Sequence, residues 1–194
     1  MSDRMTAIAD AAVHVVATRG MRGLTHRAVD AEAGLPQGST SAYFRTRKAL
    51  VEGVVARLAE QDEAEAADAD RPGPVDADAF ARSIGHLLDH WMTTGRERVL
   101  ARYACLLEAT RHPELRGILA HGDRVRAGAR ELLERAGVPD ADRRGRDLVA
   151  FLDGLLFDRL VGAGAAHAPA PGTPESRAEL VDAVRIALRA VLGK

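Results

Sequence analysis

The sequence predicts an all-helical protein, and three observations support this class. Apolar residues recur every three or four positions over most of the 194 residues, which is the helical period. No stretch alternates apolar and polar residues as a half-buried strand does. Aromatic residues make up only 4% of the chain, and alanine, leucine, arginine and glutamate, which favour helices, are abundant.

The first predicted helix extends from about Asp3 to Arg19, because its apolar residues have helical spacing and Gly20 follows as a C-cap. A second helix is predicted after Thr25, whose hydroxyl is suited to cap the first turn. It ends at Ala33, and Gly34 can adopt the left-handed conformation that turns the chain. These signals predict two helices separated by a short connection.

A third helix is predicted over Pro36–Tyr43, with Pro36 in the first position because its missing amide hydrogen would have no helical partner. Thr46 is predicted to cap a fourth helix that continues to about Asp70, roughly 35 Å in length. Two short helices joined by a glycine turn form a helix-turn-helix, the motif that places one helix in the major groove of DNA.

The net charge of −1 conceals an uneven distribution. Residues 1–50 contain seven Arg and Lys against four Asp and Glu, whereas residues 51–70 contain one against seven. A positive face on the helix-turn-helix is what neutralisation of DNA phosphates requires. The acidic run is interpreted as a solvated helix face.

Beyond residue 70 the pattern predicts further helices only. The sequence Arg71-Pro72-Gly73-Pro74 breaks the fourth helix and is the predicted domain boundary. We therefore expect a DNA-binding domain at residues 1–50, a connecting helix at 51–70, and a helical domain for effector binding and dimerisation at 71–194.

The last two predicted helices differ in character. Residues 148–161 are apolar almost all round, so a helix there must bury more than one face. These helices either complete the core or form a dimer interface, and the dimer is favoured because helix-turn-helix proteins commonly pair to read two half-sites. The residues expected at the interface are Leu152, Leu156, Leu160, Leu180, Val184, Leu188 and Val191.

Other chemistry is poorly supported. His86 and His90 are four apart, but both lie away from the apolar stripe of their helix, so no metal site is predicted. Cys105 is the single cysteine, which excludes an internal disulfide, and its apolar neighbour Leu106 favours a small core residue. No phosphate loop, nucleophile elbow or metalloprotease motif occurs, so we predict neither an enzyme nor a cofactor. No signal peptide or membrane span is predicted, which favours a cytoplasmic protein.

The segment from Met5 to Leu50 resembles the DNA-binding domain of the TetR family of bacterial transcriptional repressors. The residues that carry the resemblance are Gly20, Leu24, Thr25, Ala28, Val29, Ala33, Gly34, Leu35, Gly38, Tyr43, Phe44, Thr46 and Leu50. The resemblance implies a homodimer on double-stranded DNA with a pseudo-palindromic operator, and a small-molecule effector in the C-terminal domain.

The resemblance also implies roles for single residues. Thr25 and Tyr43 would bind phosphates, and Arg27 would lie against the backbone or a base edge. Pro36 stands where the family has a serine cap and Ser41 where it has an aromatic residue, so the base preference does not transfer. The full set expected to contact DNA is Thr25, His26, Arg27, Pro36, Gln37, Gly38, Ser39, Thr40, Ser41, Tyr43, Arg47 and Lys48.

An effector cavity would need apolar walls, which suit an apolar or amphipathic small molecule. The residues expected to line it are Trp91, Tyr103, Leu106, Leu107, Phe151 and Leu155. The alternative is that these residues only fill the core. The function expected is a repressor that a small molecule releases from its operator. Two alternatives stay open: a helical small-molecule or metal-binding protein without operator function, and a ligand-independent regulator controlled by a protein partner.

Overall fold

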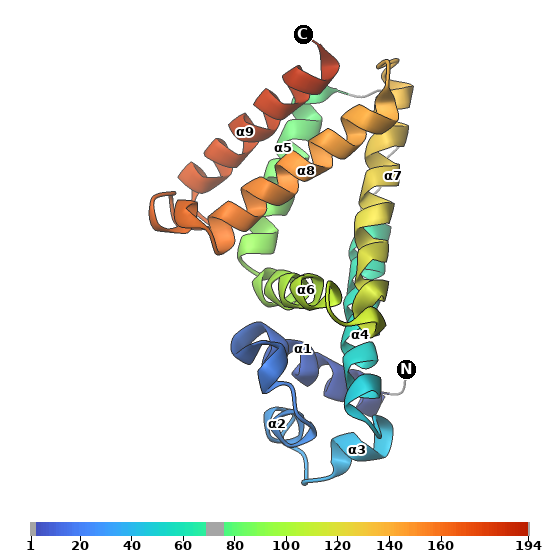
Figure 1. The fold of residues 1–194 in the computed structure, drawn as a ribbon. Helices are drawn as coiled ribbons and strands as arrows, with labels where there is room; N and C mark the ends of the chain where they lie inside the picture. Colours follow the sequence, from blue (N-terminus) through green and yellow to red (C-terminus); the bar gives the residue numbers. More distant parts are fainter. Residues whose placement is uncertain (1–2, 69–75, 194) are drawn as a thin grey trace. The chain divides into compact units, whose positions relative to one another are not determined.

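The computed structural model describes residues 3–68 and 76–193, which are almost entirely helical (Figure 1). The helices are α1 (Asp3–Gly23), α2 (His26–Glu32), α3 (Ser39–Tyr43), α4 (Arg47–Asp68), α5 (Ala77–Met92), α6 (Arg96–Ala109), α7 (Leu119–Arg135), α8 (Ala141–Leu160) and α9 (Pro174–Leu192), with the 3-10 helices η1 (Pro113–Ile118) and η2 (Ala163–Ala166). These described residues form no strand, so the all-helical prediction is confirmed. The predicted break at residues 71–74 lies outside the described residues.

The helix boundaries in the N-terminal segment follow local backbone chemistry. Gly20 interrupts α1 with a φ of 67°, as predicted, although one further helical turn follows it. The Thr25 hydroxyl accepts a hydrogen bond from the Ala28 amide at 3.1 Å and so caps α2. The Thr46 hydroxyl caps α4 in the same way. The two predicted caps are confirmed.

The third helix begins later than the sequence predicts. Pro36 is not its first residue but lies in the preceding turn, where its carbonyl accepts a hydrogen bond from the Ser39 amide at 3.1 Å. The reason is Gly38, whose φ of 95° is a left-handed conformation that the interior of a right-handed helix does not contain. The helix therefore starts after this glycine.

The chain packs as two compact units. The first combines Met1–Asp70 with Glu97–His121, and the second combines Arg71–Arg96 with Gly122–Lys194. Part of the predicted C-terminal domain thus packs with the N-terminal helices, and its contribution to that core is Ala101, Cys105, Leu115 and Ile118. The functional division at residues 50 and 71 stays a prediction.

The core of the first unit is formed mainly by α1 and α4. Ile8, Leu24 and Leu58 are fully buried in it. Phe44, which follows α3, lies directly against Gly53, since a Cβ atom at this glycine would stand 2.4 Å from the ring. This close approach fixes the end of α3 against α4.

In the second unit, α9 lies along α5 (Figure 1). The two helices approach closely because Gly85 has no side chain, and a Cβ atom there would lie 2.6 Å from the Val181 Cγ2. The Asp89 carboxylate accepts hydrogen bonds from the Gly172 amide at 2.7 Å and from Arg177 Nε at 2.8 Å. These contacts hold the start of α9 against α5.

This packing corrects the expected dimer interface. The side chains buried within the chain are Leu156, Leu160, Leu180, Val184, Leu188 and Val191, and Leu152 is half-buried. The six buried residues cannot present a surface to a second protomer, because contacts within the second unit already cover them. In the single chain α8 buries one face, whereas Phe151 and Phe157 on α8 and its C-cap residue Val161 are exposed. Burial of a second face of α8 stays a prediction.

None of the described helices is both long and apolar enough to cross a lipid bilayer.

Candidate nucleic-acid interface

The interface is built from α2, the turn after it and α3. Leu24 and Val29 are fully buried and anchor α2 on the core of the first unit. Gly34, with a φ of 64°, ends the helix and turns the chain. The Leu35 amide then donates to the Asp30 carbonyl at 2.8 Å, which closes the helix end. The position of the turn and of α3 therefore depends on α2, which the core holds in place.

Most of the side chains predicted to contact DNA are exposed around this motif. They come from the start of α2, the turn, α3 and the first turn of α4. The exposed residues are Thr25, Arg27, Pro36, Gln37, Gly38, Ser41, Tyr43, Arg47 and Lys48, and the half-buried ones are His26 and Ser39. Whether each of them binds DNA stays a prediction.

Thr40 is the clear exception. Its side chain is 0% exposed, and its hydroxyl donates to the Asp30 carboxylate at 2.6 Å. A side chain so enclosed cannot reach a base or a phosphate, so its assignment to the DNA-contacting set is corrected. Thr40 belongs to the scaffold of the motif.

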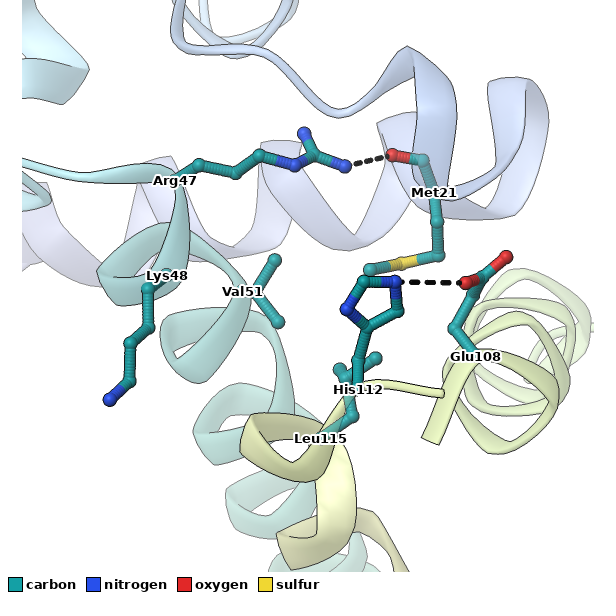
Figure 2. A pocket seen from close by; sticks show the side chains of 7 residues that line it. All are labelled: Met21, Arg47, Lys48, Val51, Glu108, His112 and Leu115. Atoms are coloured by element: carbon teal, nitrogen blue, oxygen red, sulfur yellow. Dashed lines mark hydrogen bonds and ion pairs between the residues drawn. The ribbon is translucent and has the colours of Figure 1, made fainter. Parts of the chain in front are cut away.

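Two further residues of the predicted set have partners within the protein. The His26 Nε2 lies 2.6 Å from the Phe44 carbonyl oxygen at the end of α3. The Arg47 guanidinium donates to the carbonyl of Met21 at 2.7 Å (Figure 2) and also to the carbonyl of Leu24. Both side chains therefore hold parts of the motif together, whatever they do at DNA.

Sequence reasoning missed Asp30. This carboxylate is only 3% exposed and accepts hydrogen bonds from the turn and from α3. Burial acts to raise its pKa, but the hydrogen bonds from Thr40 and Gly38 and the nearby His26 outweigh it, so that the pKa lies below its ordinary value. The available signal was that neither Pro36 nor Gly38 carries a side chain that could cap the third helix.

The residues predicted to line an effector cavity are divided between the two units. Tyr103, Leu106 and Leu107 belong to the first, whereas Trp91, Phe151 and Leu155 belong to the second. Leu106 packs against the first core, but Leu107 is 66% exposed. Neither unit alone brings the six together, so this cavity stays a prediction.

The first unit has a surface pocket of about 310 Å³ where α1, α4 and α6 meet (Figure 2). Apolar and charged side chains both line it, and the lining residues are Met21, Arg47, Lys48, Val51, Glu108, His112 and Leu115. His112 Nε2 lies 3.6 Å from the Glu108 carboxylate. The two residues are four apart in the chain, and the pair is a contact at the end of α6. None of the six predicted effector-lining residues lines the pocket.

Two other kinds of site remain to be considered, a metal site and a reactive cysteine. The described residues contain no group of three or more histidine, cysteine and acidic side chains placed to hold a metal ion. Cys105 is fully buried, and burial raises the pKa of its thiol to about 11. Cys105 is therefore a core residue, as predicted.

The fold and this interface define a class: a helical protein whose N-terminal helix-turn-helix exposes polar and cationic side chains, the arrangement of a DNA-binding transcriptional regulator. Residues 8–54 match the model for bacterial regulatory proteins of the tetR family, and residues 75–193 match that for the tetracyclin repressor-like C-terminal domain. The chain belongs to the TetR family.

Solved structures agree with this assignment. A member of the TetR family from Streptomyces coelicolor A3 is 28% identical with a TM-score of 0.69, over 95% of this chain and 98% of that chain. The multidrug binding protein EbrR complexed with ethidium is 29% identical with a TM-score of 0.64, also over 95% and 98%. A transcriptional regulator from Rhodococcus sp. Rha1 has a TM-score of 0.76 over 100% and 97%, and its 24% identity supports the fold alone. No curated protein sequence matches the chain.

Proposed function

We propose that this regulator is a repressor that binds a pseudo-palindromic operator as a homodimer and is released by a small molecule. One observation carries the DNA-binding part. The buried polar groups of the motif, Asp30 and Thr40, hold its backbone, whereas Arg27, Gln37 and Ser41 are exposed beside it. Polar side chains in that position are what direct readout of base edges requires.

Pairing of two protomers would place two copies of α3 in successive major grooves, about 34–36 Å apart or a multiple of that distance. The outer face of α8, with exposed Phe151 and Phe157 and the exposed C-cap residue Val161, is the surface we assign to this pairing. Exposed apolar side chains clustered on one helix are typical of an interface. This face replaces the buried residues that the sequence suggested.

The effector is proposed from the relatives. EbrR structures contain proflavin, ethidium or malachite green, and these are aromatic molecules. We infer an apolar or amphipathic effector of similar size for this chain. Release requires differential affinity, so the effector must bind more tightly to a dimer whose recognition helices no longer match the operator.

The test is selection of bound fragments from a pool of random duplexes, followed by sequencing. The proposal predicts an inverted repeat, and recovery of fragments without a shared sequence would contradict it. Because ethidium and proflavin intercalate into DNA, dye binding is measured first on the protein alone by fluorescence. Release of the selected duplex is then assayed with malachite green, against a control duplex held by an unrelated DNA-binding protein. A dye that binds the protein and leaves the operator complex intact would contradict release by this class of molecule.

A further inference from the structure

The recognition helix α3 has no capping side chain of its own. Gly38 occupies the N-cap position, and no side chain of the turn accepts a hydrogen bond from the first amides of the helix. Amides at a helix start need acceptors from outside the helix, and their absence weakens so short an element. An acceptor from another helix therefore has a large influence on where α3 lies.

Asp30 of α2 supplies that acceptor. Its Oδ2 accepts the Gly38 amide at 2.7 Å, and its Oδ1 accepts both the Thr40 amide at 2.7 Å and the Thr40 hydroxyl at 2.6 Å. The carboxylate is almost completely enclosed, so water does not compete for these bonds. A negative charge at this end of a helix is also favoured by the helix dipole.

The other end of α3 is tied to the same helix. The His26 Nε2 lies 2.6 Å from the carbonyl oxygen of Phe44, the C-cap residue of α3. Helix α2 thus fixes the first turn of α3 through Asp30 and its end through His26. Gln37 and Ser41, the exposed candidates for base contacts, lie within or directly beside the segment that Asp30 holds.

We propose that Asp30 is a positioning residue for base recognition, which sets the placement of α3 in the major groove through its hydrogen bonds to Gly38 and Thr40. The inference rests on the proposed function, since it assigns how that function reads sequence. Bidentate contacts to base edges need side chains placed to within about half an ångström. Phosphate contacts tolerate larger shifts, so loosening α3 should reduce discrimination more than overall DNA affinity.

The test compares Asp30→Asn with a matched control, Glu32→Gln. Both variants remove one negative charge from α2. Glu32, however, faces α1, where its carboxylate lies 3.4 Å from both Arg19 and His14. Dissociation constants are measured at one salt concentration for the selected operator and for a scrambled duplex of the same composition.

Asp30→Asn is expected to lower the ratio of operator to scrambled affinity by about tenfold, the effect of one misplaced base contact. Glu32→Gln should leave this ratio within about twofold of wild type, while both variants change scrambled binding alike through charge. A purely structural loss would reduce binding to both duplexes by the same factor, because only the folded fraction binds either.

A second measurement uses no DNA. Amide hydrogen exchange at Gly38 and Thr40 should become at least about tenfold faster in Asp30→Asn, because both amides lose the charged acceptor. Amides in α4 should keep their exchange rates. If Asp30→Asn does not fold, Thr40→Val and Thr40→Ser replace it: valine removes the hydroxyl bond and should lower the affinity ratio, and serine should restore it.

The outcomes separate the two claims. A folded Asp30→Asn protein with an unchanged affinity ratio and unchanged exchange overturns the role of Asp30 and leaves the proposed function standing. Wild-type protein that prefers no sequence overturns the proposed function and the role in base recognition together. A reduced ratio in Asp30→Asn, with a wild-type ratio in Glu32→Gln, supports the inference.

Discussion

Arg27 and Gln37 are the side chains on which base discrimination should depend most directly. Both are exposed, one in the first turn of α2 and the other in the turn before α3. Arginine can bind guanine O6 and N7 together, and glutamine can bind adenine in a similar way. We expect Arg27→Ala and Gln37→Ala each to reduce discrimination by about 1–3 kcal/mol at one base pair, measured across single-base operator variants. Equal losses on operator and random DNA would assign these residues to phosphates.

The neighbours Arg47 and Lys48 should behave differently despite their equal charge. Lys48 is exposed and only 3.9 Å from Glu52, whereas Arg47 donates to the carbonyls of Met21 and Leu24. Lys48→Ala should lower the slope of log Kd against log salt by about one and change stability by less than about 0.5 kcal/mol. Arg47→Ala should lower the free energy of unfolding by about 1–2 kcal/mol. Urea unfolding and salt titration of both variants test this, and the opposite pattern would contradict it.

At the scale of helices, a buried ion pair within the first unit ties α4 to α6 and to His121 in the first turn of α7. The Asp62 side chain is 3% exposed, and its carboxylate accepts hydrogen bonds from the Arg102 guanidinium and from His121 Nδ1 at 2.8 Å. Burial acts to raise the pKa of Asp62, but the bonds from His121 and Arg102 outweigh it and lower the pKa below its ordinary value. Ionised Asp62 therefore stabilises the folded state.

The contribution of Asp62 to the free energy of unfolding depends on pH. Because the folded-state pKa is lowered, this stabilisation is complete above the unfolded value of about 3.9 and is lost as the pH falls through the folded value. We expect the free energy of unfolding of Asp62→Asn to decrease less than that of wild type as the pH falls below about 4. Asp62→Ala should lower the free energy of unfolding by about 3–5 kcal/mol at pH 7, because Arg102 would remain buried without its partner. Urea unfolding at several pH values measures both effects. Asp123→Asn, on the exposed surface of α7, should stay near wild type at pH 7, and an equal loss there would contradict a special role for Asp62.

The helix boundaries show what a sequence can and cannot predict. The starts of α2 and α4 were predictable because Thr25 and Thr46 cap amides only three residues away. The start of α3 was not, because it depends on the left-handed Gly38 and on Asp30, which acts from the preceding helix. Local patterns report local contacts, and a cap from another element leaves no comparable signal in the sequence.

For the whole molecule, the exposed face of α8 is the surface that we expect to pair. Phe157 is 44% exposed there, and Phe151 on the same helix and Val161, the C-cap residue, are exposed too. A charge placed in an apolar interface is costly, so Phe157→Glu should raise the dimer dissociation constant by at least about 100-fold. Analytical ultracentrifugation measures this. Leu107→Glu, on α6, removes an exposed leucine of the first unit and serves as the control. A fully dimeric Phe157→Glu protein would exclude this face.

The residues expected at the interface and in the cavity show that apolar periodicity predicts which face of a helix is buried but not what covers that face. Apolar spacing correctly indicated that Leu180, Val184 and Leu188 are covered, but it could not tell a neighbouring helix of the same chain from a second protomer. In the same way, Tyr103 and Phe151 were expected in one cavity, yet they belong to different units. Periodicity identifies the buried face of a helix and leaves its partner undefined.

A salt titration of wild-type protein on the selected duplex and on a scrambled duplex tests directly whether the helix-turn-helix reads sequence. We expect two protomers per selected duplex and at least about 1,000-fold tighter binding to it than to the scrambled duplex. Both affinities should fall as salt rises, because phosphate contacts release counterions. Equal affinities for the two duplexes at every salt concentration would contradict sequence reading by the helix-turn-helix.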